Sequence, residues 1–166
     1  MPARTALEIN SLAMALSLLV LPVAGLASDR LGRRPAFLMA SGVLAVLAYP
    51  LMALMSRGET AGILVGQVSL ALIVASPGGM MPATMAELAP WRVRCTVMSV
   101  AYNLGVALLG GCTPLVATWL LASTGWALAP AAYLAGAATL SFAGAWLLPK
   151  TPAHRLTKEF ESARFR

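Results

Sequence analysis

Residues 25–35, which read Gly-Leu-Ala-Ser-Asp-Arg-Leu-Gly-Arg-Arg-Pro, separate two long runs of sequence without a charged side chain. The run before them, between Glu8 and Asp29, holds 20 residues, and the run after them, between Arg34 and Arg57, holds 22. A helix that spans a bilayer needs about 20 predominantly apolar residues. Each run is therefore long enough for one membrane-spanning helix, and the charged segment is the turn between them.

Two further runs without charged residues follow along the chain. One, between Glu59 and Glu87, holds 27 residues, and the other extends over 55 residues from Cys95 to Pro149. The longer run has room for two helices, with a break at residues 123–125, which read Ser-Thr-Gly. The sequence therefore predicts an all-α, polytopic transmembrane helix bundle with five spans. The predicted helices cover approximately residues 7–27, 36–55, 62–85, 97–122 and 128–148.

The composition agrees with a membrane location. Hydrophobic residues make up 59% of the chain and charged residues only 11%, against about 25% charged residues in a typical soluble domain. Residues 1–149 are then a membrane domain, and residues 150–166 are a basic cytoplasmic tail.

The placement of the basic residues predicts the orientation. If the five helices alternate in direction, ten of the twelve lysine and arginine residues lie on one side of the membrane. The positive-inside rule assigns that side to the cytoplasm. We therefore expect a multi-pass protein of a bacterial inner membrane, with its N-terminus outside and its C-terminus in the cytoplasm. Topology explains the net charge of +6, so the expected partner is the lipid bilayer and no nucleic acid.

The turn at residues 25–35 has the pattern G-x-x-x-D-R-x-G-R-R. Gly25 allows close contact between helices, Asp29 can pair with an arginine, and Gly32 permits a sharp reversal of the chain. A basic loop that only fixes topology is the alternative, although the glycine, Asp-Arg and Arg-Arg spacing favours a functional motif. The candidate residues in this turn are Gly25, Asp29, Arg30, Gly32, Arg33 and Arg34.

A second charged segment, residues 86–94, has the pattern E-x-x-P-x-x-x-R and adds Glu87, Arg92 and Arg94 to the candidates. These side chains can join those of the first turn in a cytoplasmic cluster of ion pairs. Exposed ion pairs contribute only about 0–1 kcal/mol each. The expected effect of the cluster is therefore a bias between two conformations. Ordinary charges at helix ends are the alternative.

Polar residues within the predicted spans mark a candidate substrate pathway. They lie in the first, third and fourth spans, whereas the second and fifth are nearly all apolar and are expected to pack outside as supports. Ser99 and Asn103 share one helix face, and residues 110–114 interrupt the middle of the fourth span, where broken helices build transporter sites. Packing through small residues is the alternative for the glycines. The candidates are Asn10, Gln67, Ser99, Tyr102, Asn103, Gly110 and Gly111.

Taken in order, these segments resemble the metabolite–proton symporter branch of the major facilitator superfamily, which includes permeases for proline and betaine, citrate and 2-oxoglutarate. The two charged loops carry the resemblance to the superfamily, and residues 102–114, Ala129-Pro130 and Tyr133 carry the resemblance to the branch. The resemblance covers nearly the whole chain. It implies a partial major facilitator fold, helices eight to twelve, in which the charged loops hold the cytoplasmic ends together when the cavity opens outward.

Transport by this superfamily uses two six-helix halves with the substrate between them, and five helices are predicted here. No carboxylate lies in the middle of a predicted span, so a proton-coupling group is absent. We therefore expect a C-terminal fragment of a secondary active transporter, for proton symport of a small organic acid or a zwitterionic osmolyte, which does not transport alone. Its partners are the missing N-terminal half and, in the full-length parent, the substrate and protons.

Two other classes of function compete with transport. One is a stand-alone truncated membrane protein with a structural or regulatory role. The other is an intramembrane enzyme, which needs an embedded nucleophile with its base or a set of metal ligands. The sole histidine, His154, lies in the tail, so neither enzymatic activity nor a cofactor or metal site is expected.

Overall fold

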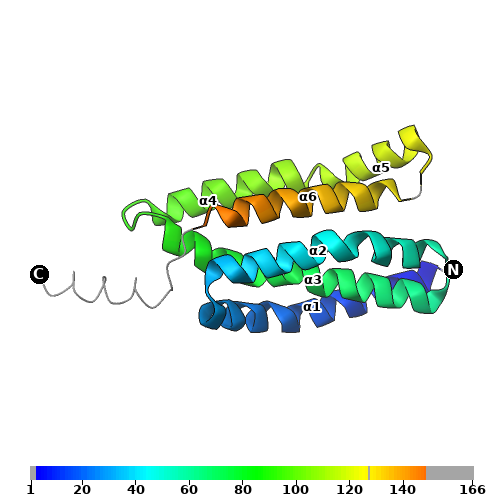
Figure 1. Ribbon diagram of the computed structural model, residues 1–166, viewed down its shortest axis with the longest axis horizontal. Helices are drawn as coiled ribbons and strands as arrows, with labels where there is room; N and C mark the ends of the chain where they lie inside the picture. The colour runs from blue at the N-terminus through cyan, green and yellow to red at the C-terminus, as the bar shows by residue number, and fades with distance from the viewer. Residues whose placement is uncertain (1–2, 127, 149–166) are drawn as a thin grey trace, which may run out of the picture.

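The computed structural model describes residues 3–126 and 128–148, and every element within these ranges is helical (Figure 1). The predicted all-α helix bundle is confirmed. The predicted tail, residues 150–166, and His154 within it lie outside the described residues. The elements in chain order are α1 (Ala3–Leu31), α2 (Arg33–Ser56), α3 (Thr60–Leu88), α4 (Arg94–Gly105), the π-helical segment η1 (Val106–Gly110), α5 (Thr113–Thr124) and α6 (Ala129–Trp146).

The long helices lie side by side, and α4, η1 and α5 follow one another along a single rod (Figure 1). α3 packs against both α1 and α2, and α2 packs on its other side against α6. The rod of α4 to α5 is joined to the rest through α6 and, near its beginning, through α3. The apolar α2 is therefore an inner helix of this bundle, whereas the rod that carries Ser99 and Asn103 lies at its edge.

Four stretches of helix are long and apolar enough to cross a membrane: Arg4–Leu31, Arg33–Ser56, Thr60–Leu88 and Arg94–Thr124. α6, with 18 residues, is shorter and rich in alanine, and it is not among the four. Large apolar side chains such as Leu18, Val23 and Leu26 are exposed along α1. A surface of this kind suits the hydrocarbon core of a bilayer.

The turn between α1 and α2 is shorter than the sequence suggests. The charged segment from Asp29 to Pro35 predicts a loop, yet α1 continues to Leu31 and α2 begins at Arg33. Gly32 alone reverses the chain, with φ of 95°, a conformation that glycine adopts without a steric penalty. Both charged ends of the motif are consequently helical and rigidly placed.

The fourth span, for which the sequence predicts one helix over residues 97–122, differs in the structure. Its middle is the π-helical segment η1, closed by a hydrogen bond from the Gly111 N–H to the Val106 carbonyl at 2.8 Å. A Cβ at Gly111 would lie 2.6 Å from the carbonyl oxygen of Ala107. The wider turn therefore brings backbone so close to this position that only glycine fits.

α1 and α3 cross in direct backbone contact. A Cβ at Gly79 would overlap the carbonyl oxygen of Leu21 and lie 2.9 Å from its carbonyl carbon. One turn further along α1, a Cβ at Gly25 would lie 3.4 Å from the Gly79 carbonyl oxygen. This crossing fixes the distance between the two helices just before their charged ends, where the candidate site lies.

Candidate functional site

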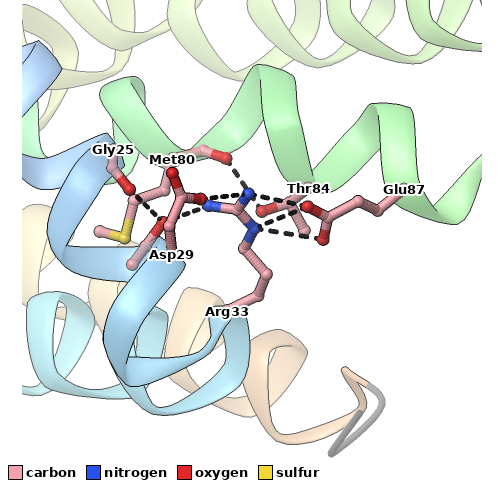
Figure 2. A network of polar contacts seen from close by, with 7 residues as sticks. Gly25, Asp29, Arg33, Met80, Thr84 and Glu87 are labelled. Atoms are coloured by element: carbon pink, nitrogen blue, oxygen red, sulfur yellow. Dashed lines mark hydrogen bonds and ion pairs between the residues drawn. The ribbon is translucent and has the colours of Figure 1, made fainter. Parts of the chain in front are cut away.

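Arg33, the first residue of α2, lies between two carboxylates that come from different helices (Figure 2). Its Nη2 is 2.6 Å from Oδ1 of Asp29 on α1 and 2.7 Å from Oε1 of Glu87 on α3. Its Nε donates to both oxygens of Glu87, at 3.1 and 3.2 Å. Only 10% of the Arg33 side chain is exposed. One guanidinium thus ties together the ends of α1, α2 and α3.

Ser28 supports this guanidinium from α1. Its hydroxyl is completely buried, donates to the carbonyl of Gly25 at 2.9 Å and accepts a hydrogen bond from Nη1 of Arg33. A buried polar group of this kind costs free energy unless it is paired, and both of its partners belong to the motif. Ser28 is not among the residues predicted from the sequence. The signal that could have found it is a serine directly before Asp29, at the end of an apolar run.

On α3, the polar side chain of Thr84 next to the cluster is bonded within its own helix. Thr84 is buried, and its hydroxyl donates to the carbonyl of Met80 at 2.9 Å. Figure 2 shows Thr84 beside Glu87 on the same helix. Neither Thr84 nor Met80 is predicted as part of the site, because hydrogen bonds within one helix have no distinct sequence pattern.

The two carboxylates differ in their access to solvent. The Asp29 side chain is 52% exposed, and that of Glu87 is 26% exposed. Because ion pairs strengthen as the local dielectric constant falls, the Arg33–Glu87 pair is the stronger of the two. The cluster carries one positive and two negative charges, so loss of Arg33 would leave two carboxylates facing each other.

The other arginines of the first motif lie outside this cluster. Arg34 lies over the ring of Trp146, 4.7 Å from its centroid, and so connects the start of α2 to the end of α6. Arg30, in the last turn of α1, is exposed and has no ion pair or ring contact within residues 3–126 and 128–148. Of the three arginines in the first motif, Arg33 is the one that pairs with both Asp29 and Glu87.

The second loop contributes Glu87 to the cluster. Arg92 lies over the ring of Trp91, 5.1 Å from its centroid. Arg94 is the first residue of α4 and is partly buried. Of the predicted residues, Gly25, Asp29, Gly32, Arg33 and Glu87 come together at the ends of α1, α2 and α3.

The predicted substrate-pathway residues fall into two groups. In one, Gln67 of α3 donates a hydrogen bond from Nε2 to Oδ1 of Asn10 on α1, at 2.9 Å. In the other, Nδ2 of Asn103 donates to the Ser99 carbonyl at 2.8 Å. Tyr102 is 47% exposed beside Asn103.

The two glycines of the predicted pathway lie at the end of the π-helical segment, since Gly110 ends η1 and Gly111 follows it. The Asn10–Gln67 pair connects α1 to α3, whereas the hydrogen bond of Asn103 stays within α4. No group of three or more metal-ligating side chains occurs in the described part of the chain.

Comparison with known proteins decides the family. Residues 4–165 match the family model described as Major Facilitator Superfamily. The chain belongs to the major facilitator superfamily. Together with the apolar helices, this membership identifies a multi-pass membrane protein, and it confirms the resemblance that the two charged loops suggested.

Several relatives in this superfamily have names that specify what they carry. The chain is 39% identical over 117 residues to the proline/betaine transporter of Escherichia coli K12, in a match that covers 70% of this chain and 23% of that protein. It is 37% identical over 121 residues to an ectoine/proline transporter of Corynebacterium glutamicum, at 70% and 23% coverage. It is 38% identical over 117 residues to a glycine betaine/proline/ectoine/pipecolic acid transporter of Dickeya dadantii, at the same coverage.

These relatives are major facilitator transporters, and none of the three is named as an enzyme. The chain spans about a quarter of the length of the curated relatives that it matches. No solved structure matches it.

Proposed function

We propose that this chain is the C-terminal part of a secondary active transporter, and that the complete transporter moves a zwitterionic osmolyte together with protons. The observation that carries the proposal is the 39% identity to a proline/betaine transporter over 70% of the chain. Of the two substrate classes that the sequence leaves open, the names of the relatives favour the osmolyte over the small organic acid.

The Arg33 cluster serves this function as a latch at the cytoplasmic ends of the helices. Alternating access needs two conformations of similar free energy. While Arg33 holds both Asp29 and Glu87, the ends of α1, α2 and α3 stay together and that side is closed. When the pairs break, water and ions replace them, so the cluster changes the population of the two states without contacting the substrate.

The polar residues of α1, α3 and α4 have the groups that a zwitterion requires. Asn10 accepts from Gln67 through its Oδ1, so both of its own amide N–H groups remain available to a substrate carboxylate. The exposed ring of Tyr102 offers a face for a quaternary or secondary ammonium group. Asn103 beside it keeps its Oδ1 as an acceptor. In the complete transporter, these groups face the cavity between the two halves.

The orientation follows from the basic residues. Ten of the twelve lysine and arginine residues lie on the side of the Arg33 cluster and the tail when five spans alternate, and this supports a cytoplasmic cluster in a bacterial inner membrane. Because no carboxylate lies in the middle of a span, the group that takes up the proton belongs to the N-terminal half.

A chimaera tests the proposal. In the proline/betaine transporter of Escherichia coli, the matching segment is replaced by this chain, and uptake of radiolabelled glycine betaine is measured in cells without osmolyte carriers. We expect uptake by the chimaera and none by this chain expressed alone. A chimaera that reaches the membrane but takes up neither glycine betaine nor proline would contradict the proposed osmolyte transport. Uptake by the short chain alone would contradict the proposal that it is only the C-terminal part of a transporter.

A stand-alone structural or regulatory role is the alternative. It predicts that the short chain occurs in native membranes as a product near 17.2 kDa and alters the activity of a full-length transporter. An immunoblot that detects only a band several-fold heavier would favour the complete transporter.

A further inference from the structure

The π-helical segment η1 lies between two stretches of one rod that pack against different neighbours (Figure 1). α5 packs against α6, whereas α4 packs against α3. Where α5 begins, the hydroxyl groups of Thr113 and of Tyr133 on α6 lie 3.5 Å apart, within reach of a hydrogen bond. Residues 89–93, which precede α4, are not helical. α6 therefore holds α5 in place, and a turn of α4 about the rod axis would be taken up by η1 and by residues 89–93.

The hydrogen bond that closes η1 displaces α4 by one residue. The Gly111 N–H donates to the carbonyl of Val106 at 2.8 Å, whereas its partner in an α-helix would be the carbonyl of Ala107. Each residue of α4 therefore occupies the place that the next residue would take in a continuous α-helix. Consecutive places differ by about 100° around the helix axis and by about 1.5 Å along it. A return of η1 to the α-helical hydrogen bond would thus turn α4 by about 100°.

Opposing preferences meet at this segment. A Cβ at Gly111 would lie 2.6 Å from the carbonyl oxygen of Ala107, so the present turn requires glycine there. Pro114 disfavours a continuous α-helix, because it has no N–H for the Gly110 carbonyl and its ring crowds that carbonyl. The α-helical hydrogen bond is nevertheless the usual one, and π-helical turns are rare and frequent at functional sites. Both registers thus have a residue or a general preference in their favour.

A change of register would exchange polar for apolar side chains on one face of α4. Ser99 and Asn103 share that face, and Nδ2 of Asn103 donates to the Ser99 carbonyl. In the α-helical register, Val100 and Leu104 take their places. We propose that Gly111 positions Ser99 and Asn103 by allowing the π register, and that a change to the α register removes both from the substrate pathway. That this face borders the pathway rests on the proposed function, whereas the register itself does not.

Double electron–electron resonance measures the orientation of α4 in the full chain, in lipid vesicles and without a transport assay. One nitroxide is attached to Leu26→Cys on α1, which lies across the bundle from the rod (Figure 1). The other is attached to the exposed Cys95 of α4, after the second exposed cysteine is removed as Cys112→Ser. A second pair of labels uses Val97→Cys in place of Cys95. Because positions two residues apart point about 200° apart, a turn of α4 must change at least one of the two distances.

Gly111→Ala should turn α4, because alanine excludes the π turn and favours the α-helix. We expect at least one label distance to change by several ångström. Gly105→Ala is the matched control, since the backbone there is α-helical and a Cβ would meet nothing within 4 Å beyond its own stretch of helix. Its distances should equal those of the unsubstituted chain. Equal distances in Gly111→Ala and the unsubstituted chain would overturn the proposal.

A deletion supplies a rescue that a merely structural role of Gly111 would not show. Removal of Leu108 from η1 places Gly111 four residues after Val106, so the same hydrogen bond becomes an α-helical one. The deletion should therefore restore the original distances in the Gly111→Ala chain and leave them unchanged on its own. It tests the register even if Gly111→Ala alone fails to fold. A turn of α4 in the chain that lacks only Leu108 would overturn the proposal.

In the chimaera, the same two changes should separate binding from turnover. Gly111→Ala withdraws Ser99 and Asn103 and should raise the half-saturating glycine betaine concentration several-fold. The deletion of Leu108 keeps both in place but prevents the change of register, so it should lower the maximal rate several-fold at an unchanged half-saturating concentration. Unchanged kinetics in both would overturn the role of the register in transport. If the unsubstituted chimaera takes up no glycine betaine, the proposed function fails, and the label distances still decide the register.

Discussion

Arg33 and Glu87 are 54 positions apart in the sequence, and the guanidinium of Arg33 contacts both carboxylate oxygens of Glu87. A charge pair of this geometry is directional as well as strong, because two donors of a planar fork meet two acceptors. It joins the start of α2 to the end of α3. The ion-pair connection between these two helix ends therefore depends on the Arg33 side chain.

Replacing Arg33 tests that dependence. Arg33→Gln leaves Asp29 and Glu87 without their cation, and breaking a buried pair costs about 3–5 kcal/mol. The partial exposure of both carboxylates places the expected loss of stability at the lower end of this range. Thermal unfolding of the purified chain in detergent measures it. Arg57→Gln, which removes an exposed arginine far from the cluster, is the control. An equal melting temperature for the two variants would show that Arg33 does not stabilise the contact between the helix ends.

The two carboxylates should contribute unequally. Glu87 is the less exposed partner and accepts from two nitrogens of Arg33, whereas Asp29 is half exposed. Glu87→Gln should therefore lower the melting temperature more than Asp29→Asn. In the chimaera, Asp29→Asn should cut glycine betaine uptake while membrane insertion stays intact. If the Asp29→Asn chimaera takes up glycine betaine as fast as the chimaera without this substitution, the Arg33–Asp29 ion pair has no role in transport.

Gly79→Ala should separate α1 from α3. The new methyl group would overlap the Leu21 carbonyl oxygen, and overpacking of this kind costs typically about 1–3 kcal/mol. A Cβ at Gly136 in α6 would meet nothing within 4 Å beyond its own stretch of helix, so Gly136→Ala is the matched control. Its effect should be neutral or stabilising, by up to about 1 kcal/mol from helix propensity. Unfolding midpoints of the two variants decide the question, and equal values would contradict the backbone contact.

Substitution of the polar pathway residues should change the apparent affinity for glycine betaine. Asn103→Ala and Asn10→Ala in the chimaera should each raise the half-saturating glycine betaine concentration about tenfold, which corresponds to about 1.4 kcal/mol. Thr118→Ala is the control, because the Thr118 hydroxyl bonds to carbonyls of its own helix. An unchanged half-saturating concentration would remove the substituted asparagine from the substrate pathway.

Coupling between Asn10 and Gln67 can be measured separately. Their side chains share one hydrogen bond at 2.9 Å, so the effects of Asn10→Ala and Gln67→Ala should not add in the double variant. A double-mutant cycle on the half-saturating concentration isolates this coupling. Fully additive effects would show that the two amides act independently of each other.

The sequence by itself determined that the chain is a bundle of apolar helices, because the length of uncharged runs and the position of charged turns are local properties. It also marked Asp29 and Glu87 as partners for arginine, since both lie in short charged segments between spans. The sequence marked an interruption of the fourth span at residues 110–114 but not the π-helical segment before it, because the extra residue in a helical turn depends on how neighbouring backbone atoms are accommodated.

Only the tertiary structure decided which arginine holds the cluster. Arg30, Arg33 and Arg34 have the same charge and reach, and they differ in the direction in which they leave their helices. That direction is set by the single-residue turn at Gly32 and by the crossing of α1 and α3 at Gly79. Because successive helical residues point about a quarter turn apart, this geometry turns Arg33 toward Glu87 and Arg34 toward Trp146. Such a choice depends on the packing of three helices, and no local pattern of residues contains it.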